Sequence, residues 1–224
     1  MVRGVCFDLD GTLLDTLHDI ADAANSVLRQ YSCPPHPVDA YRLMIGDGVN
    51  VLFQRALPPD RQDPELIQQC ADGFRRAYAE CWNVHTKPYP GIPELLDALT
   101  RRGLKLAVLS NKPHKHTRDC VAAYLSRWRF ETVLGQRDDV PRKPDPAGAH
   151  EAAAEMGLPP EQILYLGDTA VDMQTARAAG MFPVGALWGY RSAEELRQAG
   201  AEVLIDRPSE LLNLLDRSEF DRSV

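Results

Sequence analysis

The chain has 224 residues, of which 44% are hydrophobic and 25% are charged, and its formal net charge is −7. This composition is typical of a globular protein, and the length suffices for one large domain or for a domain with a smaller companion. The negative charge argues against a general binder of nucleic acid or anionic membranes, because such proteins gather positive charge on one surface. No apolar run is long enough to cross a membrane, and the first residues lack the pattern of a secretion signal. The five cysteines show no CxxC spacing and are expected to be reduced thiols in a cytoplasmic protein. We expect the protein to be a monomer or a homodimer.

Several short, nearly continuous apolar runs end in glycine or in polar residues, as strands covered on both faces do. In chain order these runs span residues 2–8, 104–111, 130–135, 163–168, 182–189 and 202–206. Helix-patterned segments that end at glycine lie between most of them, at 91–103, 146–157 and 172–180. This alternation predicts an α/β fold with a Rossmann-like, doubly wound parallel sheet.

Residues 16–88 interrupt the alternation. The segments 18–31, 49–57 and 64–82 are helix-patterned, and no convincing strand lies between them. A connection within a βα unit is short, so we expect this block to be an inserted helical domain. The prediction is a core domain of residues 1–15 and 89–224 and a helical domain of residues 16–88, with a polar, frayed tail at 216–224.

Polar residues follow four of the predicted strands. Because ligands bind at the carboxyl ends of the strands in open α/β sheets, we expect these side chains to converge on one edge. In chain order they are Asp8, Asp10, Ser110, Asn111, Lys143, Asp168 and Asp172.

Clustered carboxylates repel one another unless a cation lies between them. Oxygen ligands without histidine or cysteine suit Mg²⁺, and a cation with a lysine and a hydroxyl is typical of a phosphate site. Asp8 and Asp10 are two residues apart, so one can attack phosphorus while the other handles a proton. Gly11 allows a sharp turn, after which main-chain N–H groups can bind phosphate oxygens.

Four segments, "FDLDGTLLDT" (7–16), "LSNK" (109–112), "KPDP" (143–146) and "LGDTAVDM" (166–173), resemble the four ordered motifs of the haloacid dehalogenase superfamily. The resemblance covers nearly the whole chain, and the order of four motifs is far more specific than any one of them. The helical block at 16–88 resembles the cap of this superfamily's first cap class, which would exclude water and select the substrate.

The resemblance implies roles for the converging residues. Asp8 would be the nucleophile that forms an aspartyl-phosphate, and Asp10 the general acid and base. Asp8, the main-chain carbonyl of Asp10 and Asp168 would bind Mg²⁺, with Asp172 in or beside that set. The phosphoryl oxygens would be held by Ser110 and Lys143, with Asn111 next to them.

Among members of the superfamily, the chain most resembles bacterial phosphoglycolate phosphatases, through "GDG" (46–48), "SNKP" (110–113) and residues 188–211. The resemblance implies a small phosphorylated metabolite as substrate, with 2-phosphoglycolate first. A sugar-phosphate phosphatase or a phosphomutase is the alternative within the class. A catalytically idle module that binds phosphate or a partner is the alternative outside it. Candidate substrate contacts in the helical domain are His18, Gly46, Asp47, Gly48 and Arg55.

Some of these residues have simpler interpretations. Asp15 is expected to be a helix N-cap or a loop acid rather than a catalytic group. Asp172 could serve only as an acid in the first turn of a helix, although its place four residues after Asp168 favours the site. Lys112 competes with Lys143 for the phosphate, and the "KPDP" resemblance favours Lys143.

Overall fold

The computed structural model describes residues 1–216, so the tail predicted at 216–224 lies outside the described residues except for Asp216. The chain divides into two compact units. Residues 1–14 and the described residues from 88 to 216 form one unit, here called the core unit, and residues 15–87 form the other, here called the helical unit.

The core unit is built on one parallel sheet of six strands in the order β5-β4-β1-β6-β7-β8. The strands are β1 (Gly4–Phe7), β4 (Lys105–Pro113), β5 (Thr132–Gln136), β6 (Ile163–Gly167), β7 (Phe182–Ala186) and β8 (Val203–Ile205). Every residue of β1 is buried, because strands on both sides and helices on both faces cover it. The predicted doubly wound α/β fold is thereby confirmed.

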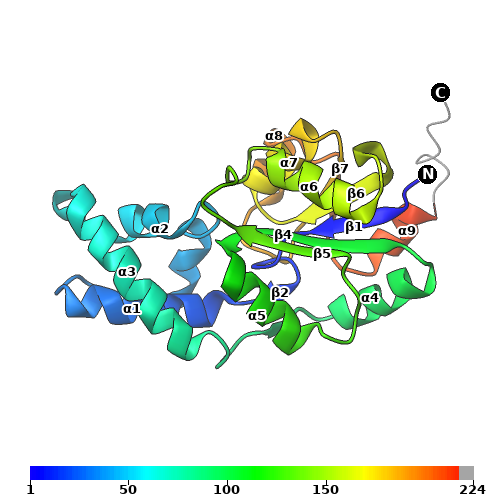
Figure 1. Ribbon diagram of the computed structural model, residues 1–224. Helices are drawn as coiled ribbons and strands as arrows, with labels where there is room; N and C mark the ends of the chain where they lie inside the picture. Colours follow the sequence, from blue (N-terminus) through cyan, green and yellow to red (C-terminus); the bar gives the residue numbers. More distant parts are fainter. Residues whose placement is uncertain (217–224) are drawn as a thin grey trace. The chain divides into compact units, whose positions relative to one another are not determined.

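Helices cover both faces of this sheet (Figure 1). The helices α4 and α5 lie on one face, and α6 and α7 pack on the other. Their bounds, with those of the remaining helices of the unit, are α4 (Ile92–Arg101), α5 (His114–Tyr124), α6 (Ala147–Met156), η3 (Pro160–Gln162), α7 (Ala170–Ala178), α8 (Ala193–Gln198) and α9 (Glu210–Leu215). The sequence interpretation missed α5. Its first six residues, "HKHTRD", are polar, so the buried Cys120 and Val121 that follow form no recognisable helical pattern.

The spacing of apolar residues explains how these helices pack. In α4, Ile92, Leu95, Leu96 and Leu99 recur at helical intervals and are buried against the core. In α6 most buried positions are small, with a glycine and three alanines beside Met156, and they let the helix approach the sheet closely. The alanines join a hydrophobic cluster with residues of β1, β4, β6 and α7. This packing holds the carboxyl ends of the central strands in fixed relative positions.

The helical unit consists of five helical segments. They are α1 (Leu17–Gln30), η1 (Val38–Leu43), α2 (Val49–Ala56), η2 (Pro59–Arg61) and α3 (Pro64–Cys81). Helix α1 packs against α3, and Phe53 meets Phe74 edge to face at a centroid distance of 6.0 Å. Asp63 caps α3 by accepting a hydrogen bond of 2.9 Å from the N–H of Leu66.

Two details differ from the sequence-based expectation. Strands β2 (Leu14–Asp15) and β3 (Lys87–Pro88) form a separate two-stranded sheet, so residues 16–88 do contain a strand. A strand of two residues shows no alternation that a pattern could reveal. The prediction that Asp15 is an N-cap or loop acid is wrong, because Asp15 lies in β2 and Thr16 is the N-cap of α1.

The cysteines and the hydropathy of the helices complete the description. All five cysteines are free thiols. Cys6 is fully enclosed in β1, and burial raises the pKa of its thiol to about 12, which fits a packing role. None of the helices within residues 1–216 has the length and apolar character needed to cross a lipid bilayer.

Candidate active site

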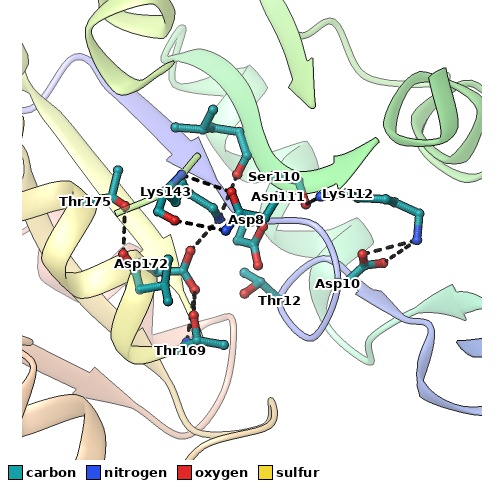
Figure 2. A network of polar contacts seen from close by, with 12 residues as sticks. Asp8, Asp10, Thr12, Ser110, Asn111, Lys112, Lys143, Thr169, Asp172 and Thr175 are labelled. Carbon is teal, nitrogen blue, oxygen red and sulfur yellow. Dashed lines mark hydrogen bonds and ion pairs between the residues drawn. The ribbon is translucent and has the colours of Figure 1, made fainter. Parts of the chain in front are cut away.

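The carboxyl ends of β1, β4 and β6 are neighbours in the sheet, and the residues after them meet at one edge. The N–H of Asp8 donates to the carbonyl of Leu166 at 2.9 Å, so the pairing of β1 with β6 continues into the first acid. Figure 2 shows Asp8, Ser110, Lys143 and Asp172 gathered there. The expected convergence of strand-end side chains therefore occurs for these residues. The Asp10 side chain is the exception, because it turns away from them.

Lys143 lies at the centre of this cluster. Its ammonium donates to Asp8 Oδ1 at 2.9 Å and to Asp172 Oδ1 at 2.6 Å. It also donates to the carbonyl of Leu109 at 3.2 Å, and only 5% of its side chain is exposed. A buried ammonium with two carboxylate partners and a carbonyl is held in one position. The group that the motif order placed near the phosphate thus contacts the candidate nucleophile directly.

Asn111 and Ser110 stand beside this lysine in different ways. The Asn111 amide accepts from the Lys143 N–H at 3.0 Å and donates to the Lys143 carbonyl at 3.2 Å. These paired bonds fix the main chain of Lys143, a positioning contact that the sequence interpretation did not foresee for Asn111. Ser110 is buried, and its hydroxyl accepts from the N–H of Lys112 at 3.3 Å.

Asp10 turns away from the other acids toward a second lysine (Figure 2). The Lys112 ammonium lies 3.0 Å from Asp10 Oδ1 and 3.2 Å from Oδ2. The two lysines that the sequence placed in competition therefore lie against different acids, Lys143 against Asp8 and Lys112 against Asp10.

Asp168 is fully buried and is held by groups from two loops. The Thr12 hydroxyl donates to its Oδ1 at 2.8 Å, and the Tyr190 N–H donates to its Oδ2 at 2.8 Å. Gly11, with φ of +90°, passes so close that a Cβ there would lie 2.8 Å from the Asp168 carboxyl carbon. A side chain at this position would collide with the acid and would also strain the backbone. Glycine after Asp10 is therefore needed for space as well as for the turn.

Asp172 combines the two roles that the sequence left open. It is the third residue of α7, where its Oδ2 accepts from the N–H and the hydroxyl of Thr169 at 3.0 and 2.7 Å. Its Oδ1 faces Lys143. The same carboxylate therefore caps a helix and belongs to the site.

Burial dominates the electrostatics of the acids. It raises the pKa of Asp8 to about 7, against the opposing effect of the Lys143 ammonium. Burial also raises the pKa of Asp168 well above its ordinary value, and the Asp172 carboxylate adds to this rise. Although burial alone would lower it, the Asp172 and Asp8 carboxylates raise the pKa of Lys143 well above that of a free lysine. The acids of the site outnumber its cations, so a further cation would stabilise their ionised forms.

The donor set fits a hard divalent cation. Asp8, Asp168 and Asp172 each present a carboxylate oxygen, these oxygens lie within 4.8 Å of one another, and all three residues are buried. Oxygen-only donors in this number are those that Mg²⁺ takes, usually together with water and substrate oxygens. The Asp10 side chain is not part of this group.

The candidate residues of the helical unit lie in two places. Gly46, Asp47 and Gly48 form the turn before α2, with φ of +121° at Gly46 and +93° at Gly48. Arg55 faces back onto this turn, where it pairs with Asp47 at 2.7 Å and donates to the carbonyl of Leu43 at 3.3 Å. Its guanidinium therefore organises the turn. His18 is exposed on α1, with its ring 5.6 Å from that of His85.

Sequence reasoning missed the loop after β7 as part of the site. The Trp188 indole N–H donates to the carbonyl of Thr12 at 3.0 Å, and Gly189 and Tyr190 lie against Asp168. The rule used for the other strands also applies to this one, because β7 ends at the same edge of the sheet. Thr12 could have been suspected from its place in the first motif.

Comparison with known proteins agrees with this geometry. The profile of the family described as "Haloacid dehalogenase-like hydrolase" matches residues 5–186. A phosphoglycolate phosphatase of Aquifex aeolicus is 34% identical over 215 residues, which cover 96% of this chain and 97% of the relative. An N-acetylmuramic acid 6-phosphate phosphatase of Pseudomonas aeruginosa is 33% identical over 224 residues, covering 98% and 97% of the two chains.

The fold has similar solved relatives as well. A structure described as a putative phosphoglycolate phosphatase from Lactobacillus delbrueckii subsp. bulgaricus superposes with a TM-score of 0.90 at 29% identity, covering 95% of this chain and 98% of that one. The family match spans more than half of the chain, includes all four motifs that meet at the strand ends, and agrees with relatives of nearly full coverage. The chain belongs to the haloacid dehalogenase-like hydrolase family.

Proposed function

We propose that this protein is a Mg²⁺-dependent phosphomonoester hydrolase that works through an aspartyl-phosphate on Asp8. The observation that carries the proposal is the buried group of Asp8, Asp168 and Asp172 with the Lys143 ammonium between two of its members. Mg²⁺ would be held by these three carboxylates and by the carbonyl of Asp10. When bound, it would offset negative charge on the phosphoryl group and on the acids.

The chemistry has two displacements. In the first, a carboxylate oxygen of Asp8 attacks phosphorus, the bond from phosphorus to the ester oxygen breaks, and Asp10 gives a proton to the departing oxygen. In the second, water attacks the aspartyl-phosphate, Asp10 takes a proton from that water, and the bond from phosphorus to Asp8 breaks. Phosphate leaves, and both acids return to their starting state.

Ser110 and Lys143 would orient the phosphoryl group during both displacements. Both side chains are buried beside Asp8, where a hydroxyl donor and an ammonium act more strongly on a developing charge than they would in water. Asn111 contributes by fixing the main chain of Lys143. We assign residues 16–88 to the helical cap, a proposal supported by the resemblance to the first cap class and by the compactness of residues 15–87.

The leading substrate is 2-phosphoglycolate, because relatives named as phosphoglycolate phosphatases match nearly the full length of the chain. The sugar-phosphate alternative has its own support, since one relative of similar identity and coverage is named as an N-acetylmuramic acid 6-phosphate phosphatase. The two substrates differ in size and in the group attached to the phosphate, so relative kcat/KM values can separate them.

The test is phosphate release by the purified protein with Mg²⁺ from a panel that includes 2-phosphoglycolate, N-acetylmuramic acid 6-phosphate, hexose phosphates and p-nitrophenyl phosphate. We expect the highest kcat/KM for 2-phosphoglycolate. A higher value for a sugar phosphate would replace the substrate while leaving the reaction class intact. Isomerisation of a sugar phosphate without phosphate release would indicate a phosphomutase. No release from any ester, including the activated aryl ester, would refute the hydrolase and favour a binding module.

A further inference from the structure

Two buried lysines each contact one of the first two acids of the first motif (Figure 2). Lys143 contacts Asp8, whereas Lys112 contacts both carboxylate oxygens of Asp10, at 3.0 and 3.2 Å. Only 5% of the Lys112 side chain and 12% of the Asp10 side chain are exposed. An ammonium removed from water loses hydration free energy, and a well-placed carboxylate offsets part of that loss. The Lys112–Asp10 pair is therefore a specific contact, unlike the screened ion pairs of a protein surface.

The main chain of Lys112 is itself held on several sides. Its N–H donates to the Ser110 hydroxyl at 3.3 Å, and its carbonyl accepts from the Thr117 hydroxyl at 3.0 Å. Gly135 of β5 passes so close that a Cβ there would lie 2.6 Å from the Lys112 carbonyl oxygen. The register between β4 and β5 shifts between Leu109 and Pro113, and such irregularities redirect side chains. The main chain of Lys112 is thus held in place, and its side chain extends from β4 in a fixed direction.

We propose that Lys112 is a positioning residue for Asp10: it holds the carboxyl group in the place from which its proton passes to the leaving oxygen. This inference rests on the proposed function, in which Asp10 protonates the ester oxygen as the bond from that oxygen to phosphorus breaks. Lys112 touches neither the phosphoryl group nor the reacting oxygen in this assignment and acts through Asp10 alone. Without Lys112, the Asp10 carboxyl group remains in the protein but loses its fixed place.

The choice of leaving group exposes this role. The leaving group of an alkyl phosphate is a strongly basic alkoxide unless Asp10 protonates its oxygen. The leaving group of p-nitrophenyl phosphate, p-nitrophenolate, is stable enough to leave without a proton. General acid catalysis typically contributes about 10²- to 10⁴-fold in rate, and only the alkyl ester depends on it. The kcat/KM of each ester reports the steps up to formation of the aspartyl-phosphate, so water attack on that intermediate does not enter the comparison.

The experiment compares Lys112→Met with the wild type on an alkyl phosphate, 2-phosphoglycolate or the best alkyl ester of the panel, and on p-nitrophenyl phosphate. We expect kcat/KM to fall by about 10²-fold on the alkyl ester, as for a catalytic group displaced by about 1 Å, and to change little on the aryl ester. Lys112→Arg keeps a cation with several donors and should recover part of the loss. Asp10→Asn gives the same selectivity between esters in a more severe form.

The matched control is Lys115→Met. Lys115 is three residues further along, 82% of its side chain is exposed, and its partner is Asp119 on the same helix. The Lys115→Met substitution should leave both kcat/KM values unchanged. Thermal unfolding of each variant shows whether it folds, and Lys112→Gln, which keeps a donor but loses the charge, replaces Lys112→Met if that protein is unfolded.

Each result has a defined meaning. Equal losses on both esters would overturn the proposal, because a general structural role does not distinguish leaving groups. An equal rise of KM on both esters with weaker inhibition by inorganic phosphate would overturn it as well, since Lys112 would then hold the phosphoryl group. If the wild type hydrolyses neither ester, the proposed function fails and the assignment of Lys112 fails with it. If the wild type hydrolyses both and Lys112→Met retains its activity on the alkyl ester, only the assignment of Lys112 fails.

Discussion

Replacing Gly189 by alanine tests how closely the structure confines Asp168. A Cβ on Gly189 would lie 2.5 Å from the carboxyl carbon of Asp168 and closer still to its Cβ. Ordinary van der Waals contact begins at 3.4 Å, so the carboxyl carbon and the new methyl group must separate by about 0.9 Å. The Asp168 Cβ is attached to the main chain just beyond β6 and cannot swing aside as the end of a long side chain can. The strain must therefore move the carboxylate or the loop after β7.

The expected loss follows from this displacement. A shift of about 1 Å in a reacting group costs about 10²-fold in rate, so we expect kcat/KM of Gly189→Ala to fall by about that factor. The assay is hydrolysis of p-nitrophenyl phosphate at several Mg²⁺ concentrations. Isothermal titration with Mg²⁺ alone gives a second readout, in which the affinity should also fall because Asp168 is one of three candidate ligands.

Gly103→Ala provides the control. Gly103 has φ of +71°, and a Cβ there would have no atom within 4 Å. Alanine costs about 1–2 kcal/mol of backbone strain in this region, so the melting temperature should fall while kcat/KM and Mg²⁺ affinity stay at wild-type values. The reasoning is refuted if Gly189→Ala keeps wild-type kcat/KM and Mg²⁺ affinity, or if Gly103→Ala loses as much of either.

Three further predictions concern the nucleophile, the cation and the helical unit. Asp8→Asn should remove turnover of every ester while leaving the melting temperature near or above that of the wild type, because a neutral amide cannot attack phosphorus and a buried, repelled carboxyl group is gone; steady-state assays and thermal unfolding check this, and full activity would contradict the mechanism. Mg²⁺ at about 100 times its Kd should stabilise the chelator-treated wild type by about 2.7 kcal/mol in thermal unfolding, and Asp168→Asn should lose most of that gain; an equal gain in both would place the cation elsewhere. Asp19→Ala should destabilise the helical unit by about 2–3 kcal/mol in urea unfolding, because this buried carboxylate accepts bonds of 2.8, 2.9 and 2.7 Å from the His85 N–H and from the N–H and hydroxyl of Thr86. Its control is Asp22→Ala, whose side chain is 59% exposed and should matter by about 0.5 kcal/mol or less; equal stability of the two variants would contradict the assignment.

Local pattern was sufficient to predict the sheet. The apolar runs ending at Asp8 and Asp168 predicted buried parallel strands, and β1 and β6 pair directly. Pattern failed where an element is very short, as in β3, or where its exposed face is strongly polar, as in α5. In both cases tertiary packing, rather than local periodicity, stabilises the element.

The sequence by itself determined that the main strand-end groups reach one edge of the sheet, because the carboxyl ends of parallel strands share that edge. Asp8, Lys143 and Asp168 could be assigned to that edge from their positions after apolar runs. The order of the four motifs then indicated the family. These inferences need only the positions of the strands along the chain and the residues at their carboxyl ends, and both can be read from the local sequence.

Only the tertiary structure decided how those groups pair. Lys112 lies near the end of β4 and Lys143 lies in the loop after β5, yet one lies against Asp10 and the other against Asp8. The contact of Gly189 with Asp168 likewise joins loops from two different strands. Such pairings depend on side-chain direction and on distances of a few tenths of an ångström, which arise only when the strands and loops are packed together, and no spacing along the chain specifies them.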